Sequence, residues 1–536
     1  MRNITALLLG SALLSLWPTF GNAATLPTLP QAFVNTTYSL PTTGTTFTPA
    51  NSLAFQTALN NAQLGDVIVL TAGTTYTGPF TLPNKSGSGW IYIQSSAISS
   101  LPAAGTRVSP ANAANMPKIV IGANLGAVIQ TQAQAHHYRF VGIEFRPVAN
   151  NFVFNLIQIG NNESQLSNLP NNIVFDRCYV HGDSTVGGRR GIVMNGNSIA
   201  VIDSHISDFK ENGADTQAIW ASNGAGPFKI VNNFLEASGE NILFGGQDPT
   251  ISNLVPSDIE IRRNHFFKPL TWIGSGWTVK NLLEFKNSRR VLVEGNIFEN
   301  NWLHAQDGEA LVITPRNQNN SAPWSTTEDI TFRLNKIINV GKGVNIAGTD
   351  DNFSSQRTSR VLIENNVIQT TALQGATGRV FQIIGGPLNI TIRHNTGFII
   401  NAGSTAVAEN SPKADQFDFR DNMLSNGTYG FIGTNTAPGT STLNGHFSNY
   451  TFLNNAIIGG GPAGSYPPNN FFPANIAAVQ FVNYAGGDYR LSASSPFTGA
   501  ASDGTDVGAN INLLEAAISG IGGGKVLPPQ KLRVTN

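Results

Sequence analysis

Short stretches of alternating apolar and polar residues recur along the chain, each followed by an asparagine and a further apolar residue. Residues 259–266 and 362–368 are clear copies. Alternation with a period of two predicts strands, because helices would repeat their apolar residues at steps of three and four. The asparagine position contains Asn233, Asn264, Asn296, Asn335, Asn366, Asn395 and Asn422, while Ile143, Cys178 and Ser204 occupy it in earlier copies.

The spacing of this position predicts stacked turns. From residue 178 to residue 422, successive copies lie 26 to 39 residues apart. A strand repeat of that length favours a coil in which each turn stacks on the last. Asparagine tolerates the left-handed backbone of a sharp bend, and asparagines on successive layers can hydrogen-bond along the stack. We therefore predict an all-β fold, a parallel β-helix.

A second strand is expected in each turn after the asparagine bend. Apolar triplets there should point their outer residues inward and their middle residue outward. Outward residues of neighbouring turns would then form columns on the surface. The triplets are residues 157–159, 192–194, 242–244, 283–285, 311–313, 344–346 and 381–383.

The ends of the repeat differ from its body. Residues 51–62 place Phe55, Ala58 and Leu59 on one helical face, which predicts a capping helix over the first coil. After Asn422 the pattern fades into a Gly, Pro and Asn-rich region, interpreted as an irregular cover. The predicted division is a signal peptide at 1–23, an extended segment at 24–50, the β-helix at 51–433, the C-terminal cover at 434–519 and a flexible tail at 520–536.

Composition and the N-terminus limit the location and the partners. Arg2, the apolar residues 6–17 and the small residues 21–23 are typical of a secretory signal, so we expect a secreted or periplasmic protein. The net charge is zero and charged residues make up only 12%, which argues against nucleic acid as a partner. No later stretch has 18 unbroken apolar residues, so no membrane association of the mature form is expected. Cys178 is the single cysteine, which excludes an internal disulfide.

Over residues 51–433, and again at 489–491 and 506–509, the chain resembles the pectin-lyase-like superfamily of right-handed parallel β-helix proteins. The opening at residues 65–70, Gly-Asp-Val-Ile-Val-Leu, is similar to the start of many members. The resemblance implies a monomer that acts on an extracellular polysaccharide. That superfamily includes lyases, glycoside hydrolases, epimerases and binding spikes, and the fold does not choose among them.

Glu284 and Lys286 are the leading candidates for chemistry. Alternation places both on the outer face, and Arg316 follows one turn later. A lyase acting on uronic acids needs a base and a group that neutralises the carboxylate. The order loosely resembles the family of chondroitinase B and alginate lyases, which implies Lys286 as base, Arg316 as acid and a calcium ion (Ca2+) held by acidic residues. The metal ligands have no match here, and Asn317 stands where the family has His-Gly.

Further residues are predicted to line the same groove. Glu240 and Asn241 lie on the preceding turn, and His304, Asp307 and Glu309 lie in the loop before the following strand; with Glu284 they form the expected substrate-binding set.

Several alternatives stay open. Glu284 and Lys286 can be a solvated surface pair of little energetic value. Outward amides can bind sugar without catalysis. A glycoside hydrolase would need two facing carboxylates, and Asp350-Asp351 is the one adjacent Asp pair, which opens a loop. The turn with Arg189 and Arg190 can hold an anionic sugar or be a basic turn in solvent.

Overall fold

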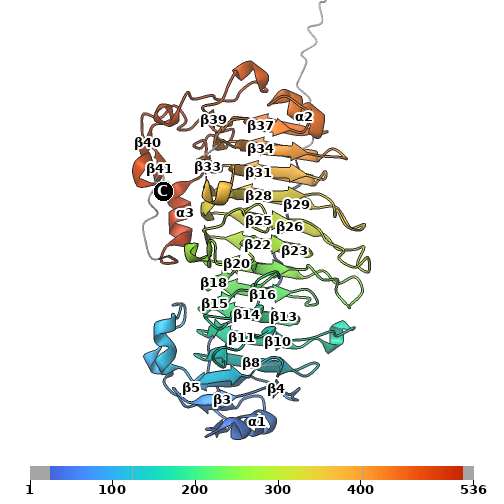
Figure 1. The fold of residues 1–536 in the computed structure, drawn as a ribbon, viewed down its shortest axis with the longest axis vertical. Helices are drawn as coiled ribbons and strands as arrows, with labels where there is room; N and C mark the ends of the chain where they lie inside the picture. The colour runs from blue at the N-terminus through green and yellow to red at the C-terminus, as the bar shows by residue number, and fades with distance from the viewer. Residues whose placement is uncertain (1–23, 123–124, 401, 523–536) are drawn as a thin grey trace, which may run out of the picture.

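The computed structural model describes residues 24–122, 125–400 and 402–522. Within them the strands form three long parallel sheets of 14, 13 and 12 strands, here called sheets A, B and C (Figure 1). Hydrogen-bonded neighbours in a sheet come from successive coils, so each coil contributes one strand to each sheet. The predicted right-handed parallel β-helix is therefore confirmed. The predicted signal peptide and most of the predicted tail lie outside the described residues.

Sheet A consists of β1 (Thr46–Phe47), β2 (Val67–Leu70), β5 (Ile91–Ser95), β8 (His136–Val141), β11 (Asn171–Asp176), β14 (Asn197–Ile202), β17 (Phe228–Val231), β20 (Ser257–Arg262), β23 (Ser288–Glu294), β26 (Thr327–Arg333), β29 (Ser359–Glu364), β32 (Leu388–Arg393), β35 (Asp415–Arg420) and β38 (Tyr450–Leu453). Sheet B consists of β3 (Thr75–Thr77), β6 (Lys118–Ile121), β9 (Glu144–Pro147), β12 (Tyr179–His181), β15 (His205–Phe209), β18 (Phe234–Ala237), β21 (His265–Phe267), β24 (Ile297–Glu299), β27 (Lys336–Val340), β30 (Val367–Thr370), β33 (Thr396–Phe398), β36 (Met423–Ser425) and β39 (Ala456–Ile458).

Sheet C consists of β4 (Phe80–Leu82), β7 (Ile129–Thr131), β10 (Asn155–Ile159), β13 (Arg190–Met194), β16 (Gln217–Ala221), β19 (Glu240–Phe244), β22 (Leu283–Phe285), β25 (Glu309–Ile313), β28 (Lys342–Ala347), β31 (Arg379–Ile384), β34 (Ser404–Glu409) and β37 (Phe431–Gly433). Each turn thus has three strands rather than two. The predicted second strand corresponds to sheet C, and the strands of sheet B are the short segments directly after the asparagines.

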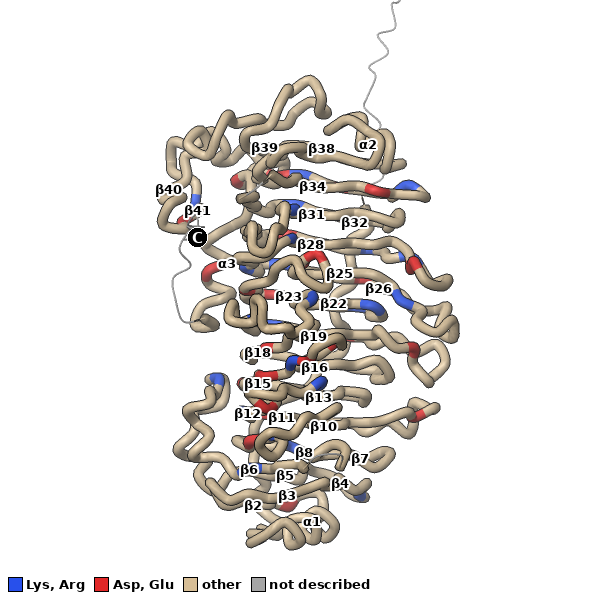
Figure 2. The backbone as a smooth tube through the Cα atoms, in the orientation of Figure 1, with Lys and Arg blue, Asp and Glu red and all other residues tan. Residues whose placement is uncertain are grey.

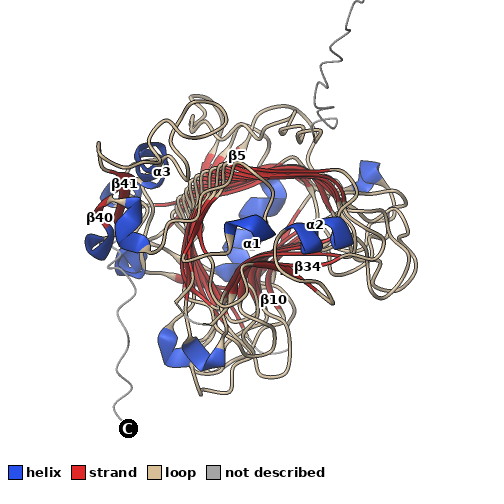
Figure 3. Cartoon of the chain, turned by 90° about the horizontal axis from the view of Figure 1, so that it is seen from above, coloured by secondary structure: helices blue, strands red, loops and turns tan. Residues whose placement is uncertain are grey.

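The core lies inside the coil, enclosed by the three sheets when the molecule is seen along its axis (Figure 3). Inward side chains of successive turns lie above one another, as parallel register requires. Phe266 and Phe298 stack with ring centroids 4.3 Å apart, and Phe140 and Phe175 stack at 5.2 Å. Burial of this continuous apolar column is the main stabilising contribution, because no disulfide is formed.

The asparagines form a ladder at the bend between sheets A and B. Asn296 Oδ1 accepts hydrogen bonds from the backbone N of Asn264 at 2.8 Å and from its Nδ2 at 3.1 Å. The ladder continues beyond Asn422, through Asn455 to Asn470. The expectation that the asparagine itself adopts the left-handed conformation is wrong. The residue before it does so, as at Arg263 with φ of 57°, which leaves the asparagine amide free to point along the stack.

Helices close both ends of the coil. The predicted capping helix is α1 (Ser52–Asn61), in which Asn51 caps Ala54 N at 2.9 Å and Phe55 and Leu59 are buried against the first coil. At the other end α2 (Thr440–His446) packs on the last coils, and β38 and β39 extend the stack past residue 433.

The C-terminal residues fold back along the side of the β-helix. The hairpin of β40 (Phe481–Asn483) and β41 (Asp488–Leu491) and the helix α3 (Ile511–Ile518) lie against sheet B (Figure 1). The sequence predicted a cover at this point, without placing it on a face. The cover packs on sheet B because the outward residues of sheet B on these turns are apolar. They include Ile297, Ile338, Val367, Phe398 and Met423.

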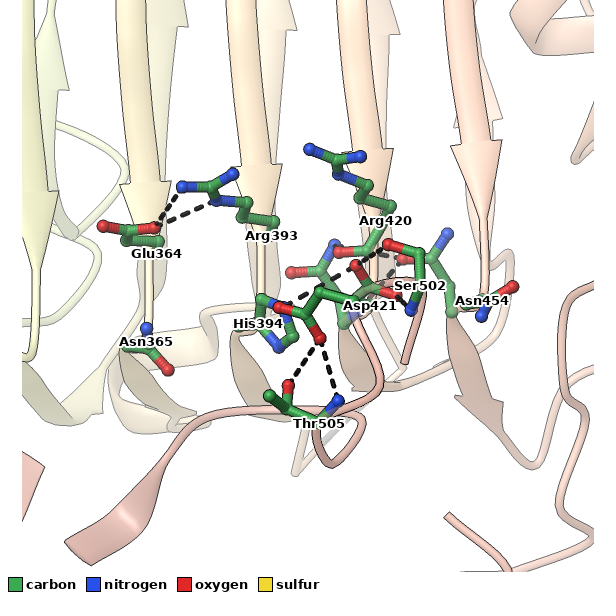
Figure 4. A network of polar contacts seen from close by, with 12 residues as sticks. Glu364, Asn365, Arg393, His394, Arg420, Asp421, Asn454, Ser502 and Thr505 are labelled. Atoms are coloured by element: carbon green, nitrogen blue, oxygen red, sulfur yellow. Dashed lines mark hydrogen bonds and ion pairs between the residues drawn. The ribbon is translucent and has the colours of Figure 1, made fainter. Parts of the chain in front are cut away.

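Polar contacts fix this cover to the bend of the coil (Figure 4). His394 Nε2 lies 3.1 Å from Asp503 Oδ2, and Ser502 donates its backbone N to Asp421 Oδ1 at 2.7 Å. Thr505 donates its hydroxyl to Asp503 at 2.7 Å, which holds the loop closed. Among the described residues, no helix is long and apolar enough to span a membrane.

Candidate functional site

A column of polar side chains runs along sheet C, parallel to the coil axis. Each member lies two residues before the apolar triplet of its turn, as Glu240 does before residues 242–244. Register pairs Arg190 with Gln217, Gln217 with Glu240, and Glu309 with Lys342 on successive turns. Charges of both signs lie along the stacked turns (Figure 2). We call this set the sheet C column: Arg190, Gln217, Glu240, Asn281, Glu309, Lys342 and Arg379.

Glu240 occupies the middle of the column and is almost fully buried. Its Oε2 accepts a hydrogen bond from Gln217 Nε2 at 2.8 Å, and Gln217 Oε1 accepts one from Arg190 Nε at 2.9 Å. Burial, and then the negative charges of Glu284 and Asp215, raise the pKa of Glu240 to about 8. Glu240 is therefore mainly a protonated acid at neutral pH.

Glu284 and Lys286 form an ion pair on the next turn. Lys286 Nζ lies 3.2 Å from Glu284 Oε1; the Lys286 side chain is 18% exposed and that of Glu284 only 3%. The other carboxylate oxygen of Glu284 is buried without a hydrogen-bond partner. Gly245 has φ of 94°, and a Cβ there would lie 2.7 Å from Asn287 N, so glycine allows the preceding turn to pack against this strand end.

Arg316 lies beside Lys286 on the following turn. Its backbone N donates to Lys286 O at 2.8 Å. Its guanidinium forms ion pairs with Asp350 at 3.0 Å and Asp351 at 2.8 Å, and its side chain is 17% exposed. The adjacent aspartates thus hold Arg316 in place. An open cavity of about 560 Å³ lies next to them, lined by Asn320 and residues 349–355.

Lys280 and Asp215 lie near the two glutamates, and no pattern in the sequence pointed to them. Lys280 Nζ lies 2.5 Å from Asp215 Oδ1. Burial disfavours the charged form of Lys280, but Glu240 and Asp215 outweigh that effect and raise its pKa. Two lysines, Lys280 and Lys286, therefore compensate the acidic charge of this centre.

The loop residues predicted to line the groove belong to a second group, one turn further along. Asp307 pairs with Lys342, and Glu309 is buried on the same turn. Burial raises the pKa of Glu309, and the positive charge of Lys342 partly opposes that shift. His304 Nδ1 accepts a hydrogen bond from Val279 N at 3.2 Å, which joins two surface loops.

Asn241 lies away from both groups. Its Nδ2 donates to Leu235 O at 2.6 Å, and its Oδ1 accepts from Lys268 Nζ at 3.1 Å. The buried Lys268 Nζ also donates to the backbone carbonyls of Ala237 and Ser238, at 2.7 and 3.0 Å. Asn241 and Lys268 therefore brace the turn between sheets B and C.

The side chains near Lys286 do not fit a calcium site. Among the described residues, no group of three or more His, Cys, Asp or Glu side chains is arranged to hold a metal ion. Asp350 and Asp351 are engaged with Arg316, and Asp248 accepts backbone hydrogen bonds from Gln318 and Asn319 at 2.5 and 2.9 Å. We derive no step through a metal.

Most members of the column could have been found from the sequence by one rule. They lie two residues before the first apolar residue of each predicted triplet, as Arg379 does before Phe381. Gln217 and Trp220 could not be found in this way, because the triplet Ile219-Trp220-Ala221 was not among the predicted strands. Its outer residues include a small alanine, which weakens the apolar signal.

Solved structures that are similar to this chain share little sequence with it. No protein-family model matches the chain, and no curated protein matches it. Similar solved structures include an alginate lyase from Paenibacillus sp. str. FPU-7 (13% identity, 80% of this chain and 97% of that chain, TM-score 0.30). Others are a GH87 α-1,3-glucanase from Streptomyces thermodiastaticus strain HF3-3 (12%, 82% and 70%, TM-score 0.44) and PfbA, a surface adhesin of Streptococcus pneumoniae (13%, 76% and 87%, TM-score 0.41). One fold can carry many functions, so function must be argued from the site.

Proposed function

We propose that the protein is a secreted lyase that cleaves an acidic, uronic-acid polysaccharide by β-elimination, with Lys286 and Arg316 at the reaction centre. One observation carries the proposal. Lys286 and Arg316 lie on neighbouring turns, joined by a backbone hydrogen bond from Arg316 N to Lys286 O, and both side chains are partly exposed. A base and, on the adjacent turn, a cation are what proton removal next to a carboxylate requires.

In this mechanism the Lys286 ammonium, paired with Glu284 in the free protein, first loses a proton to solvent, and its uncharged amine then takes the proton from C5 of the uronate. The electron pair of that C–H bond forms the C4–C5 double bond, and the C4–O bond to the leaving sugar breaks. Arg316 stabilises the negative charge that builds on the carboxylate and the leaving oxygen. The ammonium of Lys286 or a water molecule then protonates that oxygen, so that atoms and charges balance.

The test is the absorbance of unsaturated uronate products. Wild-type protein is incubated with alginate, pectin and a glycosaminoglycan, beside Lys286→Ala and the control Lys229→Ala on sheet A. We expect one polymer to give a rising absorbance with wild type and Lys229→Ala, and none with Lys286→Ala. Equal rates for the two variants would remove Lys286 from the base role.

A glycoside hydrolase is the second candidate, favoured by the environments of Glu240 and Glu284. Burial keeps the first protonated, while Lys286 compensates the charge of the second, and such a division suits a general acid and a carboxylate base or nucleophile. New reducing ends without new absorbance, lost in Glu240→Gln, would support it. Tight binding of a polysaccharide without any cleavage would instead support a binding protein.

A further inference from the structure

We infer that Arg190, held between Phe154 and Trp220, is a subsite for the carboxylate or sulfate group of a sugar unit two turns away from Glu240. The inference rests on the proposed function, because it assigns the recognition of negative charge at the same column. It concerns binding, however, and can be tested without turnover.

The aromatic residues hold the guanidinium of Arg190 from two turns. It lies 4.3 Å from the ring centroid of Trp220 and 5.4 Å from that of Phe154. Trp220 Nε1 donates to Gly245 O at 2.9 Å, which fixes the indole, and Arg190 N donates to Phe154 O at 3.1 Å. Stacking of this kind orients a guanidinium while leaving its edge open to a planar anion.

Arg190 lacks an acidic partner among the described residues. Its Nε donates to Gln217 Oε1 at 2.9 Å and its Nη1 to Asn155 Oδ1 at 3.4 Å, and both acceptors are neutral amides. The neighbouring Arg189, in contrast, is bound by both oxygens of Glu211 at 2.6 and 2.7 Å. Burial lowers the pKa of Arg190 to about 10, while the charges of Asp215, Glu240 and Glu211 oppose that shift without a direct ion pair, so the guanidinium stays charged at neutral pH. An anion that binds there would be a direct ion-pair partner and form strong hydrogen bonds.

The surroundings also fit a sugar. Phe154 is 53% exposed beside the guanidinium of Arg190, and the guanidinium of Arg189 lies 4.2 Å from its ring centroid. Gln217 connects Arg190 to Glu240 by a hydrogen bond on each side, which aligns the subsite with the acidic centre. Arg190 and Glu240 are two turns apart, which is about 10 Å at the usual strand spacing. A polysaccharide lying along the column would therefore contact both.

Binding is measured by calorimetry on full-length protein carrying Lys286→Ala, which prevents turnover in the proposed mechanism. The probes are a galacturonate tetramer, its methyl ester and a sulfated carrageenan tetramer. We expect one of the charged probes to bind more tightly than the ester, and its identity tells carboxylate from sulfate. Adding Arg190→Gln should weaken the binding of that probe about 10- to 100-fold and leave the binding of the ester unchanged.

Matched variants separate charge from stacking and from folding. Phe154→Ala should weaken the charged probe and the ester alike, and Arg190→Lys should fall between wild type and Arg190→Gln. Arg262→Gln is the control, because Arg262 lies on sheet A, bound to Glu260 and Glu294. Arg190→Gln should keep the melting temperature, since its hydrogen-bond partners are neutral.

The inference is overturned if the ester binds as well as both charged probes, if none of the three binds, or if Arg190→Gln binds the preferred charged probe unchanged. If Arg190→Gln fails to fold, the binding of Arg190→Lys is measured instead. Unchanged binding of the preferred charged probe to Arg190→Lys would then overturn the inference. A protein that shows the expected binding but cleaves no polyuronate would retain this subsite and lose the lyase proposal.

Discussion

Gln217 donates its side-chain amide to the Glu240 carboxyl over 2.8 Å, from the turn directly below. This contact is set by the parallel register of β16 and β19, which places residues 23 positions apart in the sequence side by side. The oxygen of the same side-chain amide accepts a hydrogen bond from Arg190 Nε. A buried acid and a partly exposed cation are thus joined by one neutral side chain, and the chemistry of the column depends on that register.

Glu240→Gln should change how stability depends on pH. The pKa of Glu240 is raised from 4.5 to about 8 in the folded protein, so folding favours the protonated form. The contribution of the protonated Glu240 carboxyl to the free energy of unfolding is complete below pH 4.5 and is lost as the pH rises through 8. Melting curves from acid to alkaline pH should show wild type losing stability relative to Glu240→Gln. Parallel curves would mean that the carboxyl titrates normally.

Asn296→Ala should destabilise the protein strongly, by on the order of 3 kcal/mol. The Asn296 amide donates to Ile261 O at 3.0 Å and to Asn335 Oδ1 at 2.9 Å, and accepts from Asn264, so its loss leaves buried groups unpaired. Denaturant unfolding measures the change. The exposed Asn161→Ala is the control, and a similar loss in both variants would argue against the ladder.

Leu514→Ala should release the C-terminal cover, whereas Leu513→Ala should not. Leu514 is fully buried against sheet B, and its neighbour in α3 is 55% exposed. Truncating a buried leucine costs about 2–5 kcal/mol. Limited proteolysis should therefore cleave residues 476–522 faster in Leu514→Ala. Equal cleavage of the two variants would show that α3 contributes little to docking.

Asp350→Asn should loosen Arg316 and reduce any lyase rate. The Asp350 carboxylate is buried and pairs with Arg316 at 3.0 Å, so its loss leaves a guanidinium held by Asp351 alone, whose side chain is 85% exposed. Initial rates on the cleaved polymer measure the effect. Asp351→Asn should have a smaller effect, and the reverse order would contradict this account of how Arg316 is held.

The repeat predicted the architecture because register and burial act on every turn in the same way. Asn264 and Asn296 could be aligned from their spacing alone, and α1 from the apolar face containing Phe55 and Leu59. The position of the cover could not be predicted. Ile297 and Val367 are apolar residues in short apolar strands, so the sequence does not show that they point outward and pack against the cover. Their partners lie more than a hundred residues away.

The site was predicted only where the chemistry was local. Glu284 lies on β22 and Lys286 directly follows that strand, two residues later, so alternation placed them together. The ion pair of Lys280 with Asp215 and the amide-only bonding of Arg190 depend on loops that meet through tertiary packing. No local spacing encodes those contacts.

Mass spectrometry of the products from polyuronate tests the central claim most directly. If Lys286 and Arg316 carry out β-elimination, wild-type protein releases unsaturated oligomers that are one water lighter than the products of hydrolysis. Saturated oligomers, or polymer that stays intact with every polyuronate tried, would contradict the account.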